Sequence, residues 1–73
     1  MNEEYHTLCQ RTIEHLKQAQ IKLQASQRSI GTAIRFNAIN GNERKLLSRV
    51  KIDLVDPIEQ IESVIIALKI SIQ

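Results

Sequence analysis

The sequence predicts an all-α fold, an antiparallel helical hairpin that associates with a further chain as a dimer or heterodimer. From about Glu3 to Ile39, apolar and small residues recur at heptad spacing without a proline. A turn signal, Asn40-Gly41, follows this segment. The segment from Arg44 to Gln73 then places apolar residues on two opposite helix faces. Because one neighbouring helix covers only one face, the other face predicts association.

One face of the first helix is expected to form the seam of the hairpin. Large residues fall every seven positions, at Cys9, Leu16, Leu23 and Ile30. Small residues follow three positions after each of them, at Thr12, Ala19, Ser26 and Ala33. Small residues allow a neighbouring helix to approach closely, and the large residues fill the layers between them.

The first helix is expected to end at Asn40-Gly41, because glycine adopts the left-handed conformation that often follows a last helical turn. Asn42 is then expected to cap the second helix, with Glu43 in the first turn. So short a connection makes the two helices antiparallel neighbours.

The second helix is expected to complete the seam and to be kinked or broken near Pro57. Its matching heptad series is Leu47, Leu54, Ile61 and Leu68, and Val50 and Val64 fall on the same apolar stripe. Pro57 lacks an N–H group and clashes with the preceding turn, which predicts the interruption near Val55. Alternatively, Asp56 caps a restarted helix that has Pro57 at its first position.

A second apolar stripe on the opposite face of this helix indicates the function. At about 100° per residue, the positions that lie away from the seam are Ile52, Val55, Ile66 and Ile70. An exposed stripe of this kind is typical of a protein-interaction module, so these four residues are the predicted partner-binding surface. When the protein is alone, homodimerisation would cover the same stripe by symmetry.

Charge is distributed unevenly along the chain, whose 73 residues are expected to form one domain. Residues 17–51 contain eight basic side chains and one acidic side chain, whereas the remainder contains two basic and seven acidic ones. A hairpin therefore has a basic loop end and an acidic open end. The basic end offers contacts to phosphates, but its one aromatic, Phe36, and the absence of a recognition-helix pattern favour a solvated face or a contact with an acidic partner surface over nucleic acid.

No catalytic residue, metal site or cofactor is expected. His6, Cys9 and His15 are the one candidate cluster, but the spacing turns His15 away and no fourth ligand is evident. The single cysteine excludes an internal disulfide and favours a reducing cytoplasm. The longest apolar run, Val64 to Leu68, is far shorter than the roughly 20 residues that cross a bilayer. The acidic amino terminus also differs from a secretory signal.

The chain resembles the small E-type co-chaperones of bacterial type III secretion systems. The likeness rests on the length, on the helix, loop, helix plan and on the segment from Ile58 to Ile70, where residues 61–65 resemble an aliphatic-Glu-Ser-small-Ile run. The resemblance implies a cytoplasmic heterodimer with a tetratricopeptide-like chaperone, and the pair keeps the needle subunit unpolymerised. Two alternatives remain open: a homodimeric helical structural protein, and a small nucleic-acid-binding regulator that uses the basic loop end.

Overall fold

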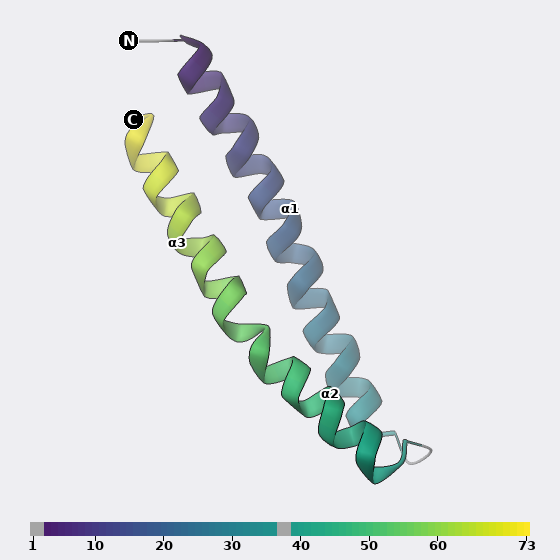
Figure 1. Ribbon diagram of the computed structural model, residues 1–73. Coiled ribbons are helices and arrows are strands. Elements are labelled where there is room, and N and C mark those ends of the chain that lie inside the picture. Colours follow the sequence, from purple (N-terminus) through teal and green to yellow (C-terminus); the bar gives the residue numbers. More distant parts are fainter. Residues whose placement is uncertain (1–2, 37–38) are drawn as a thin grey trace.

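Two helical arms lie side by side and form a long rod in the computed structural model, which describes residues 3–36 and 39–73 (Figure 1). The first arm is α1 (Glu3–Ile34), and the second consists of α2 (Gly41–Asp53) and α3 (Val55–Ser71). α1 packs against both α2 and α3, and the described residues contain no strand. The rod measures 57 × 15 × 13 Å and has a radius of gyration of 16.9 Å, against about 11 Å for a compact domain of this length. The all-helical prediction is confirmed.

The interior of the rod is one narrow seam between the arms. In the described part of the chain, three apolar side chains are buried, namely Cys9, Ile13 and Ile65, which are 4%, 7% and 2% exposed. Cys9 and Ile13 lie on α1, and Ile65 lies on α3. Two helices packed side by side bury only the centre of one stripe each, because no third element covers the flanks.

The heptad positions expected in the seam are buried or half-buried with one exception. Cys9 is buried, and the half-buried ones are Thr12, Leu16, Ala19, Leu23, Ile30, Ala33, Leu47, Leu54, Ile61 and Leu68. Ser26 is exposed, and its hydroxyl donates to the carbonyl of Lys22 at 3.0 Å. Gln27 is the half-buried residue at this level. Ala19 and Ala33, one heptad before and one heptad after Ser26, are half-buried, so the exposure is local to Ser26.

The stripe of the second arm that meets α1 is narrower than the periodicity predicted. Val50 and Val64, which the pattern placed on it, are each 46% exposed. A single neighbouring helix covers only part of the predicted stripe, and these two side chains lie outside the covered part.

The second arm begins two residues earlier than the sequence predicted. Asn40 is the N-cap of α2, and its side-chain oxygen accepts from the backbone N–H of Glu43 at 2.8 Å. The prediction of Asn42 as the cap is wrong, since Asn42 lies in the first turn of α2. The prediction of a left-handed glycine is also wrong, because Gly41 is helical and has a negative φ. An N-cap side chain accepts from the second or third N–H of its helix. Asn40 does so with Glu43, which is the third residue of α2.

Arg44 closes the end of the first arm. α1 ends at Ile34 and not near Ile39, and positions 37 and 38 of the expected helix lie outside the described residues. The Arg44 guanidinium donates through Nε to the Ile34 carbonyl at 2.9 Å, and through Nη2 to the Phe36 and Ile39 carbonyls at 3.3 and 3.4 Å. The last carbonyls of a helix have no partner within it. The Arg44 guanidinium therefore satisfies the last carbonyl of α1, and its fork of donors also reaches two carbonyls of the turn.

The predicted interruption of the second arm is confirmed and falls at Leu54, between α2 and α3. Leu54 keeps dihedral angles of −76° and −15°, and its carbonyl accepts from the N–H of Ile58 at 3.2 Å, so the arm continues in nearly the same direction. Pro57 has no N–H to donate to the carbonyl of Asp53, which explains the position of the break. Leu54 is the N-cap of α3, so the alternative of Asp56 as a cap is wrong.

Gly31, a buried residue of α1, lies beside the end of the Lys51 side chain near the loop end of the rod. The ammonium nitrogen of Lys51 lies 3.2 Å from the point where a Cβ atom of residue 31 would stand. The backbone carbonyl of Lys51 accepts from the side-chain amide of Gln27 at 3.2 Å. The backbone carbonyl of Lys51 is therefore bonded to the first arm, and its exposed side chain lies beside Gly31.

Ile65→Ala should lower the free energy of unfolding by about 2 to 5 kcal/mol, because it leaves a cavity at the most buried side chain of the seam. In a domain of this size each kcal/mol corresponds to a fall in Tm of about 4 to 8 °C. Thermal unfolding followed by circular dichroism at fixed concentration measures the change. The control is Ile21→Ala, since Ile21 is 58% exposed and should change stability by less than about 0.5 kcal/mol. Equal effects of the two substitutions would contradict the position of the seam.

Arg44→Met should destabilise the hairpin by about 1.5 to 3 kcal/mol, because hydrogen bonds from a charged group to three carbonyls are lost. Arg44→Lys should recover little of this loss, since an ammonium group lacks the planar fork. Urea denaturation is the measurement, and Lys45→Met at the neighbouring exposed position is the control. Full stability of Arg44→Lys would show that charge alone is sufficient at the turn.

Candidate interaction surface

The four residues predicted to bind a partner are all exposed in the closed hairpin. Ile52 of α2 is 70% exposed, and Val55, Ile66 and Ile70 of α3 are 43%, 49% and 63% exposed. Large apolar side chains at this level of exposure normally occur singly on a surface. Here four of them share one face of the second arm, which makes this face the candidate interaction surface.

These residues belong to a stripe with the spacing of a helix-packing seam. The stripe, called the outer stripe below, consists of Ile52, Val55, Glu59, Ser63, Ile66 and Ile70. Successive members are three or four residues apart, which keeps them on one face of the arm. All six side chains are exposed. The outer stripe thus has an apolar pair at each end and two polar residues between the pairs.

Two neighbouring glutamates of α3 differ in their contacts. Glu62 faces the first arm, where one of its carboxylate oxygens accepts from the side-chain amide of Gln20 at 2.8 Å. Glu59 lies on the outer stripe, and within residues 3–36 and 39–73 its carboxylate has no hydrogen-bond or ion-pair partner. The backbone carbonyl of Glu59 accepts from the hydroxyl of Ser63 at 3.2 Å. Glu59 therefore presents an unpaired charge in the middle of the outer stripe.

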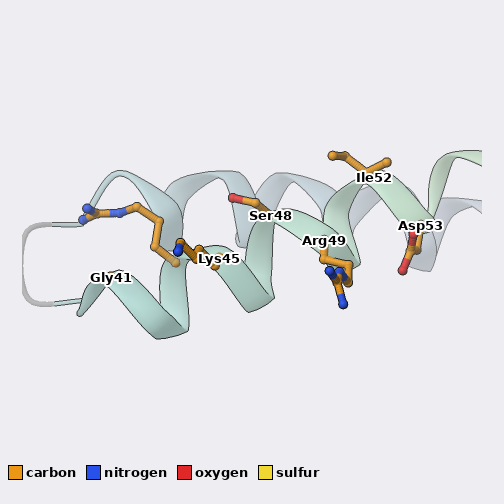
Figure 2. Close-up of a pocket in the computed structure, with 7 residues that line it drawn as sticks. Gly41, Lys45, Ser48, Arg49, Ile52 and Asp53 are labelled. Atoms are coloured by element: carbon orange, nitrogen blue, oxygen red, sulfur yellow. The ribbon is translucent and has the colours of Figure 1, made fainter.

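A shallow pocket of about 710 Å³ continues this surface toward the loop end. It is lined by Gly41, Arg44, Lys45, Ser48, Arg49, Ile52 and Asp53. Figure 2 shows that the labelled residues all belong to α2, with the Ile52 side chain above that of Arg49 in this view. Arg44 is engaged with the turn, so Lys45 and Arg49 are the cations of this pocket that remain for a partner. We call this pocket the basic surface.

The three side chains of the candidate metal cluster all lie on the first arm and differ in burial. Cys9 is buried in the seam, His6 is half-buried, and His15 is exposed. In the part of the chain that the structure describes, no three His, Cys, Asp or Glu side chains are grouped closely enough to hold a metal ion.

The described helices also include none with the length and apolar character needed to cross a membrane.

Comparison with known proteins gives no identification. Models of protein families, curated proteins and solved structures were searched, and none matches the chain significantly. The candidate surface is therefore interpreted from its own residues.

Proposed function

We propose that the chain is a protein-interaction module whose outer stripe packs against a helix of another protein. The observation that carries this proposal is the exposure of Ile52, Val55, Ile66 and Ile70 on one face of the closed hairpin. Burying one isoleucine side chain contributes on the order of 1.5 to 3 kcal/mol. The described part of the rod buries three apolar side chains, so burying further ones against a partner would add substantially to its stability.

Within this role, we propose a cytoplasmic type III secretion co-chaperone that stabilises a tetratricopeptide-like chaperone and helps to keep the needle subunit unpolymerised. The support is the length, the helical hairpin and the run from Ile61 to Ile65. This run contributes Ile61 and Ile65 to the seam and Glu62 to the contact with Gln20. Tetratricopeptide repeats are themselves pairs of helices, so they offer grooves for an apolar helix face. The proposed action is helix packing without a chemical step.

A homodimeric structural protein is the competing function, and it would use the same stripe. The two proposals differ in which chain covers Ile66 and Ile70. A purified homodimer that gives way to a co-expressed helical partner favours the co-chaperone, whereas one that persists beside every such partner favours the structural role.

Combining Ile66→Ser with Ile70→Ser should abolish co-purification of a tetratricopeptide-like chaperone from the native host, because two exposed apolar contacts are lost together. Affinity purification followed by mass spectrometry measures the association, and circular dichroism should show unchanged helix content. The matched control combines Ile21→Ser with Leu46→Ser, since both residues are 58% exposed and lie outside the outer stripe. The control should retain the partner. If the Ile66/Ile70 variant also retained the partner, the outer stripe would not be part of the interface.

The basic surface supports a second candidate function, nucleic-acid binding. Lys45 and Arg49 are exposed beside the pocket on α2 and are able to contact phosphates. This function ranks second because Arg44, one of the cations nearby, is held against the turn. The lone aromatic Phe36 also offers little stacking.

If nucleic acid binds here, affinity for duplex DNA should fall steeply with salt, by a log–log slope of about −0.9 per neutralised phosphate. Combining Lys45→Ala with Arg49→Ala should reduce that slope by about 1.8, corresponding to two phosphates. Fluorescence anisotropy with a labelled duplex is the measurement. Arg11→Ala with Lys69→Ala is the control, because these cations lie outside the basic loop segment. An unchanged slope in the Lys45/Arg49 variant would exclude the basic surface as the DNA site.

A further inference from the structure

The outer stripe is interrupted at its centre by one unpaired charge. Glu59 stands between the apolar pair Ile52 and Val55 and the apolar pair Ile66 and Ile70. Glu62, one turn further along, is already bonded to Gln20 across the seam. Glu59 is thus the acidic group that any helix seated along the whole outer stripe must cover.

A helix that covers Glu59 has to supply a partner for the carboxylate. Removing an ionised group from water is unfavourable unless it is paired and hydrogen-bonded. In helix-packing seams, one polar residue at a core position selects the partner and fixes the register for this reason. An apolar residue opposite Glu59 would leave the charge unpaired, whereas a lysine or arginine would form a charge-assisted hydrogen bond.

We propose that the outer stripe selects a partner helix that carries a lysine or arginine between two apolar clusters, with the basic residue opposite Glu59. This inference rests on the proposed function, because it assumes that the outer stripe is the interface. It adds the chemistry by which the partner is recognised. The apolar pairs contribute affinity, and Glu59 contributes register and discrimination.

A second copy of the chain does not meet this requirement. Parallel pairing of two outer stripes places Glu59 directly opposite Glu59 of the other copy. Antiparallel pairing that matches Ile52 with Ile70 leaves the two Glu59 residues four positions apart, or about 6 Å along the helix axis. Either arrangement brings like charges together within a seam, which opposes self-association through this face.

Two synthetic amphipathic peptides of 21 residues test the proposal. Such a helix is about 31 Å long and covers the roughly 27 Å from Ile52 to Ile70. The peptides have leucine and isoleucine at the core positions and differ only at the central one, which is lysine or glutamate. Their Kd values for the full chain are measured by fluorescence anisotropy, at concentrations where each labelled peptide is monomeric. We expect the lysine peptide to bind at least tenfold more tightly than the glutamate peptide.

Charge reversal of the protein provides the matched comparison. Glu59→Lys should reverse the preference, and Glu59→Gln should reduce it to less than threefold. Glu59→Leu should strengthen self-association at least tenfold in sedimentation velocity, since it completes the apolar stripe. Because Glu59 is exposed, circular dichroism should show the same helix content in all three variants.

The outcomes separate this inference from the proposed function. Equal binding of both peptides, lost when Ile66→Ser is combined with Ile70→Ser, overturns the role of Glu59 and keeps the outer stripe as an interface. Binding that survives the Ile66/Ile70 variant overturns both. Failure of both peptides to bind, or unchanged self-association of Glu59→Leu, also counts against the inference.

Discussion

The narrow contact between two helical arms is the constraint on which the rest of the structure depends. Two helices can bury only the centre of one stripe each, and here that centre consists of Cys9, Ile13 and Ile65. Polar side chains extend the same seam, because Gln20 bonds to Glu62 and Gln27 bonds to the carbonyl of Lys51. Because hydrogen bonds are directional, these two bonds help to fix the axial alignment of the arms, whose contact has little apolar area.

The same constraint explains why the surface of the second arm remains apolar. Ile52, Val55, Ile66 and Ile70 lie on a face that α1 cannot reach, and their exposure follows from the number of helices. The break at Leu54 does not disrupt this face, since hydrogen bonds from Leu54 to Val50 and from Ile58 to Leu54 keep the two helices in line. A partner helix would therefore meet a stripe that crosses the break.

Local signals predicted the helices better than their ends. The heptad periodicity and Pro57 were sufficient for the two arms and for the interruption. The turn was placed incorrectly because Asn40 and Asn42 are both good caps by residue type, and only Asn40 reaches the N–H of Glu43 in the hairpin. Ser26 and Gln27 show the same limit, because Gln27 faces the seam, where its side-chain amide donates to the carbonyl of Lys51, although the heptad pattern pointed to Ser26.

The sequence by itself determined that the chain is helical and that one apolar face is left uncovered, because both follow from the period of the apolar residues. Only the tertiary structure decided which charged groups are already engaged. Glu59 and Glu62 are equivalent by residue type, yet Glu62 bonds to the first arm and Glu59 does not. Arg44 and Lys45 differ in the same way, since Arg44 is held by the turn. The reason is that these partners come from the other arm or the turn, and the rotation and axial offset of the arms set which side chains meet.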